Sequence, residues 1–302
     1  MKTTRSSALT ALAAVLFCLA SIPDPAQADP LIYACGFNES RLIRIDLATG
    51  AVTNIGSSLG VSGAMGFAFR PDGTAYTVTQ SRLATVDLRT GKATVVGSTG
   101  AGMGLAFSPD GTLYGVGSGS LWKVDPATAK ATRVGAHAGN TMDLAFHPDG
   151  TLYAIEPSAL FRFDATTGKW TLVKSLSGVS NPMGLVISSD GTFYASDYVN
   201  PAIVARIDVT TGQATPVVQT KIGPFCGIGL LPEPKLRISR QASEMTLSWP
   251  EWESESFVLE VSPTLPALEW QPVAASPTAN GGLRSVTIRP AEFARFYRLR
   301  RP

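Results

Sequence analysis

The sequence is short of charge, histidine and cysteine, and these shortages exclude several functional classes. Charged residues make up 16% of its 302 residues, the formal net charge is +2, and there are 2 histidines and 3 cysteines. No basic stripe provides the positive surface that nucleic-acid binding requires. Motifs for a serine nucleophile elbow, a phosphate-binding loop and an HExxH metal site are also missing. The sequence therefore predicts no nucleic-acid partner and none of these catalytic sites.

Long hydrophobic runs are missing too, apart from one at the N-terminus. The apolar residues 8–20 follow Lys2 and Arg5 and precede the small-x-small sequence Ala26-Gln27-Ala28. This run is too short for a membrane-spanning helix, which needs about 20 apolar residues. Its flanks are typical of a secretory signal peptide. We predict a signal peptide over residues 1–28, cleaved after Ala28, and a secreted or periplasmic chain without a membrane span.

What the sequence has in abundance is a repeated phrase. It reads MGFAFRPDGTAY from Met65, MGLAFSPDGTLY from Met103, MDLAFHPDGTLY from Met142 and MGLVISSDGTFY from Met183. Successive copies therefore begin 38, 39 and 41 residues apart. A period near forty, built from short apolar runs and glycine-containing turns, is typical of the blades of a β-propeller.

The number of blades follows from counting strand-like segments, four of which make up each repeat. The chain after the signal peptide begins with a second strand, residues 31–34, that has no first strand before it. Near the end of the repeats, residues 225–230 form a first strand with nothing after it. Pairing these two fragments would close the ring and remove an exposed sheet edge. We predict a five-bladed, four-stranded propeller over residues 29–232.

The character of the chain changes after residue 232. Periodicity stops, and short alternating segments separated by Pro and Gly turns follow. Such segments predict a small β-sandwich of fibronectin-III-like type over residues 233–302. The six expected strands are residues 236–239, 245–249, 257–261, 270–273, 285–288 and 296–299.

Most of the aspartates repeat in every blade, and we interpret them as turn residues. A function that needs one site does not need an equivalent residue in each repeat. One set occupies the Pro-Asp-Gly type of hairpin: Asp72, Asp110, Asp149 and Asp190. The other set begins Asp-x-x-Thr-Gly turns, with Ala129 replacing Gly in one copy: Asp46, Asp87, Asp125, Asp164 and Asp208.

Aligning the five inner strands leaves one conspicuous departure. The position after the Met column reads Gly66, Gly104, Asp143, Gly184 and Gly227. Glycine there would let five backbones approach the axis closely. Asp143 breaks this column and is the leading candidate site residue. A structural alternative stays open, in which its carboxylate binds backbone groups in the channel.

Other polar residues are expected at the same end as Asp143, since loops entering inner strands and loops leaving second strands share one face of a propeller. Their carboxylate and amide oxygens would suit Ca²⁺, our candidate cofactor, or a polar ligand. For each of them a turn role is the alternative. Asn38 and Glu39 belong to this set. The predicted ligand-binding residues are Asp143, Asn140, Asn181, Glu156, Asp197, Tyr198 and His137, and the predicted metal ligands are Asp143, Asn140 and Asn181.

Signal-peptide cleavage leaves two cysteines, Cys35 and Cys226, on the two strands expected to pair at the closure. In an oxidising compartment a disulfide between them could persist. No hairpin fixes the register of this pair, so the two side chains face either the same side or opposite sides. A disulfide and a pair of buried free thiols are both open.

The segment Asn181-Pro182-Met183-Gly184-Leu185-Val186, with the Asp190-Gly191-Thr192-Phe193-Tyr194 hairpin, resembles NHL-repeat and regucalcin/gluconolactonase-like propellers. The resemblance spans the repeats and implies the scaffold. Regucalcin-like enzymes bind a divalent metal at inner-strand openings, which implies a metal role for Asp143, Asn140 and Asn181. The chain departs from that family in blade number, which is usually six, and in the glycines of the other blades. Streptogramin-lyase-like propellers use an axial histidine, and only His137 lies at the right end.

The C-terminal region resembles small terminal β-modules of secreted bacterial proteins, through Leu247-Ser248-Trp249-Pro250 and Phe296-Tyr297-Arg298-Leu299. The leading hypothesis is thus an exported, non-catalytic propeller that binds a protein, glycan or small molecule near Asp143. The alternative is a metal-dependent hydrolase or lyase of the regucalcin-like kind. That site would be centred on Asp143, with Asn140, Asn181 and Glu156, and a metal-bound water would be the nucleophile.

Overall fold

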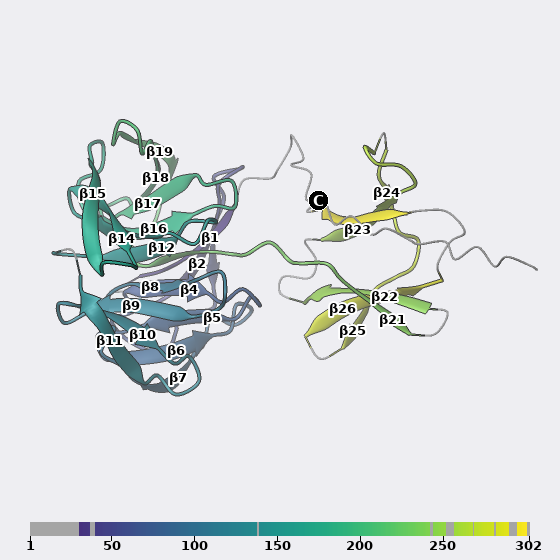
Figure 1. Cartoon of the computed structure of the whole chain (residues 1–302), viewed down its shortest axis with the longest axis horizontal. Helices are drawn as coiled ribbons and strands as arrows, with labels where there is room; N and C mark the ends of the chain where they lie inside the picture. Colours follow the sequence, from purple (N-terminus) through teal and green to yellow (C-terminus); the bar gives the residue numbers. More distant parts are fainter. Residues whose placement is uncertain are drawn as a thin grey trace, which may run out of the picture. The chain divides into compact units, whose positions relative to one another are not determined.

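The computed structural model describes residues 30–36, 40–137, 139–241, 244–251, 257–267, 269–280, 282–289 and 295–300. Within these ranges every regular element is a β-strand (Figure 1). The chain divides into two compact units, Ala28–Pro234 and a second unit that begins at Lys235. The predicted signal peptide, Asn38 and Glu39 lie outside the described residues.

The Ala28–Pro234 unit is built from repeated four-stranded antiparallel sheets, the arrangement of a β-propeller. In four of the sheets the strands follow one another along the chain. They are β4 (Gly66–Phe69), β5 (Ala75–Val78), β6 (Arg82–Val86) and β7 (Ala93–Ser98); β8 (Leu105–Phe107), β9 (Leu113–Gly117), β10 (Ser120–Val124) and β11 (Ala131–Ala136); β12 (Asp143–Phe146), β13 (Leu152–Glu156), β14 (Ala159–Asp164) and β15 (Lys169–Ser175); and β16 (Pro182–Ile187), β17 (Phe193–Asp197), β18 (Ile203–Ile207) and β19 (Ala214–Gln219).

A further sheet joins the two ends of this unit. Its order is β20-β1-β2-β3, with β1 at Leu31–Cys35, β2 at Leu42–Asp46, β3 at Val52–Ile55 and β20 at Ile228–Leu230. β20 pairs antiparallel with β1, opposing Ile32 to Leu230 and Ala34 to Ile228. The two unmatched fragments of the sequence therefore do pair with each other.

The first strands of the sheets, here called the inner strands, surround a common channel. They are β20, β4, β8, β12 and β16; each contacts the next, and β20 contacts β4. Three residues from every inner strand line a cavity of about 90 Å³. Next to this cavity, at the glycine positions of the inner strands, the backbones lie too close for an added Cβ. A Cβ on Gly66 would lie 2.6 Å from the Met103 carbonyl oxygen, and one on Gly227 would lie 2.4 Å from that of Met65. The glycine column is therefore required by close approach.

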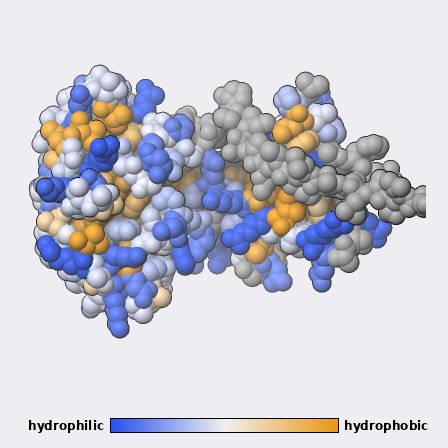
Figure 2. Space-filling model, in the orientation of Figure 1, coloured by the Kyte–Doolittle hydropathy of each residue, from blue (hydrophilic) through white to orange (hydrophobic). Residues whose placement is uncertain are grey.

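Apolar side chains between neighbouring sheets form the core. Between the sheets β4–β7 and β8–β11, for example, Val78 and Leu83 pack with Leu105 and Leu113, all fully buried. Burying a side chain of this size stabilises the fold by about 1.5–3 kcal/mol. On the visible face of this unit, hydrophobic residues lie in small groups among hydrophilic ones (Figure 2). Exposed apolar residues of the outer strands include Val95, Val134, Leu172 and Val217.

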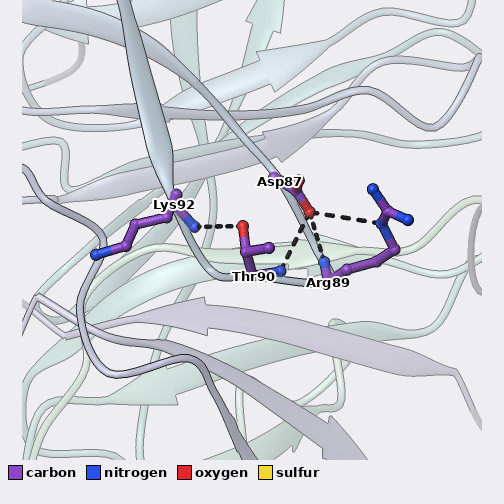
Figure 3. Close-up of polar contacts among 4 residues, drawn as sticks. All are labelled: Asp87, Arg89, Thr90 and Lys92. Carbon is purple, nitrogen blue, oxygen red and sulfur yellow. Dashed lines mark hydrogen bonds and ion pairs between the residues drawn. The ribbon is translucent and has the colours of Figure 1, made fainter.

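The repeated aspartates hold turns, as the repetition predicts. In the turn after β6, Oδ1 of Asp87 accepts the backbone N–H of Arg89 at 2.8 Å and of Thr90 at 3.2 Å (Figure 3). Gly91 follows in the left-handed region with φ of 68°, where a Cβ is disfavoured. These hydrogen bonds hold the pKa of Asp87 below its ordinary value. The carboxylate is thus engaged in the turn itself.

The second unit contains two antiparallel sheets. One has the order β21-β22-β26-β25 and the other β24-β23-β27. Leu247 and Trp249 of the first pack with Leu259 of the second in one buried cluster. In the second sheet the buried Glu260 binds Arg298 at 2.9 Å and Arg300 at 2.7 Å. The strands are β21 (Arg237–Gln241), β22 (Glu244–Pro250), β23 (Val258–Ser262), β24 (Gln271–Pro272), β25 (Thr278–Asn280), β26 (Leu283–Ile288) and β27 (Phe296–Arg300).

Candidate functional site

Asp143 is the first residue of the inner strand β12 and is fully buried. Its Oδ1 accepts the backbone N–H of Leu105 in β8 at 3.2 Å. Its Oδ2 accepts that of Leu185 in β16 at 3.0 Å. One carboxylate therefore joins β12 to the inner strands on both sides. The neighbouring glycine leaves room for it, since a Cβ on Gly104 would lie 2.5 Å from Oδ1 of Asp143.

The electrostatics of Asp143 reflect this enclosure. Burial raises the pKa of the carboxyl well above its ordinary value, and backbone N–H groups of Leu185, Leu144 and Leu105 offset part of the rise. Each oxygen already faces the positive end of an amide. A cation that approached the same oxygens would meet those N–H groups, so this donor set does not fit a metal ion. The geometry favours the structural alternative, in which Asp143 binds backbone groups in the channel.

The remaining predicted residues lie where the inner strands begin and the second strands finish, which we call the entry end. In the sheet β16–β19 three of them come together. Oδ2 and Oδ1 of Asp197 accept the backbone N–H groups of Ser180 at 2.9 Å and Asn181 at 2.6 Å. The Tyr198 N–H donates to the Asn181 carbonyl oxygen at 2.9 Å. Asp197 is 3% exposed, so its carboxylate anchors the loop that enters β16.

In the sheet β12–β15, Glu156 occupies the position of Asp197, as the last residue of the second strand. It is half-buried, and its Oε1 is buried without a hydrogen-bond partner among the described residues. A Cβ on the exposed Gly139 would lie 3.0 Å from Oε1 and 3.3 Å from Oε2. The loop entering β12 therefore passes next to this carboxylate without the two amide bonds that Asp197 makes.

His137 belongs to the same loop as Gly139. Its Nδ1 accepts the Gly139 N–H at 3.1 Å. Partial burial lowers the pKa of His137, and the nearby carboxylate of Glu156 opposes this shift. The structure therefore brings His137 and Glu156 together, and it leaves Asn140 exposed to solvent beside them.

Sequence reasoning missed Thr141. It is 4% exposed, and its Oγ1 is buried without a partner among the described residues. The position before the Met column reads Ala64, Gly102, Thr141, Pro182 and Phe225. Thr141 is thus the one polar residue of that column, and the comparison that isolated Asp143 would have found it as well.

Cys35 and Cys226 are buried and are not joined by a disulfide in the structure. The sulfur of Cys35 lies 3.8 Å from the Thr77 hydroxyl oxygen and 3.8 Å from the Gly227 carbonyl oxygen. Burial raises the pKa of the Cys35 thiol to about 12. Of the two alternatives left open by the sequence, the structure has the pair of buried thiols.

No group of three or more His, Cys, Asp and Glu side chains is placed to hold a metal ion in the described part of the chain. Separately, none of its described segments forms a helix long and apolar enough to cross a membrane.

No protein-family model matches the chain, and no curated protein matches its sequence. Among solved structures it is similar to a symmetrical protein from a study of de novo evolutionary emergence, at 22% identity and a TM-score of 0.48, over 68% of this chain and 100% of that one. It is also similar to TolB of Acinetobacter baumannii, at 19% identity and a TM-score of 0.42, over 74% of this chain and 61% of that one. A third similar structure is a catalytically inactive virginiamycin B lyase of Staphylococcus aureus, solved with quinupristin. Its identity is 16% and its TM-score 0.40, over 86% of this chain and 96% of that one. These are likenesses of the propeller scaffold and say nothing of a ligand or a reaction.

Proposed function

We propose that this chain is an exported, non-catalytic β-propeller of five blades, closed by β1 and β20, that binds a protein, glycan or small molecule at its entry end. Five four-stranded sheets among the described residues of the Ala28–Pro234 unit, and the succession of contacts between inner strands, support the blade number. The basic, apolar and small-x-small pattern of residues 1–28 supports export. The two sheets after Lys235 share one core and support an accessory module of fibronectin-III-like type.

One observation favours binding over the predicted metal-dependent reaction. Both oxygens of Asp143 are hydrogen-bonded to backbone amides, and the carboxyl is fully buried. The group expected to centre a metal site is therefore committed to joining strands. The other polar residues of the entry end still line loops, where binding residues are commonly placed on a rigid scaffold.

The proposal is tested by screening purified full-length protein against glycan and small-molecule libraries, with the thermal shift as the readout. Ligands that raise the Tm of the wild type should lose that effect in an Asn140→Ala/Asn181→Ala/Tyr198→Phe variant. An Arg89→Ala/Lys92→Ala variant, changed in a turn between strands β6 and β7, is the matched control. Ligands whose effect survives the entry-end changes would rule out this end as the site.

The enzyme alternative has its own test. A metal-dependent hydrolase should be purified with bound metal and should lose thermal stability in EDTA and regain it with Ca²⁺. We expect the Tm to be indifferent to both additions. A reproducible metal content of one ion per chain with a Ca²⁺-dependent Tm would overturn the non-catalytic assignment.

A further inference from the structure

Two neighbouring sheets place a carboxylate at the same point of the entry end and use it differently. Asp197 closes β17 and accepts two backbone N–H groups from the loop before β16. Glu156 closes β13, but the corresponding loop does not bind it in the same way. There the Gly139 N–H, the counterpart of the Ser180 N–H, donates to Nδ1 of His137 instead. Oε1 of Glu156 is left buried and without a partner among the described residues.

A second unpartnered group lies in the equivalent position across the strands. In the sheet β16–β19, Pro182 opposes Asp197 in the strand register. In the sheet β12–β15, Thr141 stands in the place of Pro182 and Glu156 in the place of Asp197. The residues next to them, Met142 and Ile155, are joined by a hydrogen bond from the Met142 N–H to the Ile155 carbonyl oxygen. Side chains of opposed residues on antiparallel strands lie on the same face. By the same correspondence we place the Thr141 side chain on the side of the Glu156 carboxylate. The Thr141 hydroxyl is buried and has no partner among the described residues.

The site is open on one side. Gly139 is exposed and Glu156 only half-buried. Any side chain at position 139 would begin 3.0 Å from Oε1 and would cover the carboxylate. Glycine at this position, where the neighbouring sheet has Ser180, leaves Glu156 half-buried instead of covered, with Oε1 as the buried oxygen.

We infer that Glu156, Thr141 and His137 form a binding site for a primary ammonium group, an inference that rests on the proposed function and names the chemistry of its ligand. An ammonium group carries three N–H donors and one positive charge. It would donate to the Glu156 carboxylate and to the Thr141 hydroxyl oxygen, both of which lack a partner among the described residues, and its charge is opposite to that of the carboxylate. The imidazole of His137 lies near Glu156.

One observation favours an ammonium group over a metal ion. The described residues hold no cluster of three His, Cys, Asp or Glu at which a metal ion would find enough ligands. Partial burial lowers the pKa of His137, which favours the uncharged imidazole beside a cation of either kind.

The chain offers a built-in reporter, because it has 2 histidines. His147 lies at the other end of β12 and its imidazole contacts Asp149 and stacks near Phe193, so it is an internal control. Full-length protein is titrated with ethylammonium chloride while the imidazole signals are followed by NMR. We expect a saturable shift of the His137 signals and none of His147. Tetramethylammonium, which has the charge but no N–H, and ethanol, which has no charge, should bind at least tenfold more weakly.

Three substitutions test the assignment of groups. Glu156→Gln should weaken ethylammonium binding at least tenfold. Glu156→Asp introduces the residue type that the neighbouring sheet has at position 197. It should also lose binding, because the shorter carboxylate would accept backbone N–H groups of the loop before β12, as Asp197 does from the loop before β16. Thr141→Val should lose binding without any fall in Tm, since no hydrogen bond of its hydroxyl is removed.

Each other outcome overturns the inference. If Ca²⁺ shifts His137 and ethylammonium does not, the site binds a metal. If neither does and Thr141→Val lowers the Tm, buried water satisfies both groups and the site is structural. The proposed function fails separately: a library ligand that needs Asn181 and Tyr198 but leaves His137 unaffected would uphold binding at the entry end and refute only the ammonium site.

Discussion

The sheets β12–β15 and β16–β19 carry the same phrase and differ at three points of the entry end. Where one has Gly184, Pro182 and Asp197, the other has Asp143, Thr141 and Glu156. In the sheet β16–β19 the carboxylate anchors its own loop. In the sheet β12–β15 one carboxylate joins three inner strands and the other is left with an unpartnered oxygen.

This difference shows how a repeat protein separates scaffold from chemistry. Residues common to all copies solve packing and turning, and a departure from them is tolerated only where it finds new partners or keeps a free group for binding. Asp143 is a departure that found partners. Thr141 and Glu156 are departures whose buried polar groups find no partner among the described residues, and burying such groups costs about 1–3 kcal/mol each.

The largest expected effect comes from breaking the glycine column. In Gly104→Ala the new Cβ would lie 2.5 Å from the Asp143 Cα and 2.9 Å from the Met142 carbonyl oxygen, both backbone atoms that cannot rotate away. We expect a loss of about 3 kcal/mol in the free energy of unfolding, the upper end of the usual overpacking cost. Denaturant unfolding measures it. Gly135→Ala, whose Cβ meets nothing nearer than 4.0 Å, is the control and should be close to wild type.

Asp143→Asn keeps the shape of the side chain and removes one acceptor. Its NH₂ group would face the N–H of either Leu105 or Leu185, two donors that cannot bond, at a cost of about 2 kcal/mol. Burial raises the pKa of Asp143 above its ordinary 3.8. The carboxyl group of the wild type therefore binds its proton more tightly in the folded protein than in the unfolded chain. Its stability should fall as the pH rises from 3.8 through the folded value.

The variant has no such proton to lose. Its deficit relative to the wild type should therefore be widest in acid and should narrow as the pH rises. Unfolding free energies measured for both proteins across this range test the sign. A deficit that widens with pH, or an Asn variant as stable as the wild type, would contradict the role given to Asp143.

The sequence predicted the repeated part of this architecture well. The hairpins between first and second strands follow from Pro-Asp-Gly turns, which are local signals. The pairing of β1 with β20 joins distant residues, and it was predicted because the repeat leaves two unmatched fragments. The glycine column was likewise predicted, and the added-Cβ distances at Gly66 and Gly227 explain it.

The partners of Asp143 were beyond the sequence because they are non-local. Leu105 and Leu185 are 38 and 42 residues away, on strands that meet only when the sheets assemble. The state of Cys35 and Cys226 was open for the same reason, since no turn fixes their register. Glu156 and Asp197 look alike in sequence, and only the path of the loops before β12 and β16 separates them.

Asp197→Ala and Glu156→Ala form the pair that tests the opening comparison most directly. The first removes the acceptor of two backbone N–H groups and should cost about 2 kcal/mol. The second removes a carboxylate whose Oε1 has no partner among the described residues. The burial cost that this relieves offsets the packing that is lost, so the variant should be no less stable than the wild type. In a unit of this size 1 kcal/mol corresponds to roughly 2–4 °C in Tm, so calorimetry resolves the two. Equal losses would mean that both carboxylates anchor their loops.

The smallest effect is expected in the Asp-x-x-Thr-Gly turns, where Ala129 stands at φ of 62° and Gly168, one sheet further on, at 67°. Ala129→Gly relieves about 1 kcal/mol of left-handed strain. It also removes a fully buried methyl group, worth about 0.8 kcal/mol, and it loosens the unfolded chain by about 0.4–1 kcal/mol. Together these contributions lower the free energy of unfolding slightly, on the order of 0.5 kcal/mol.

Gly168→Ala is the opposite substitution, at a position where a Cβ meets nothing within 4 Å. Strain of about 1 kcal/mol is then offset by a similar gain from a stiffer unfolded chain. Both variants should therefore melt within a few degrees of the wild type, and a clear gain in Ala129→Gly would show that the buried methyl group contributes nothing.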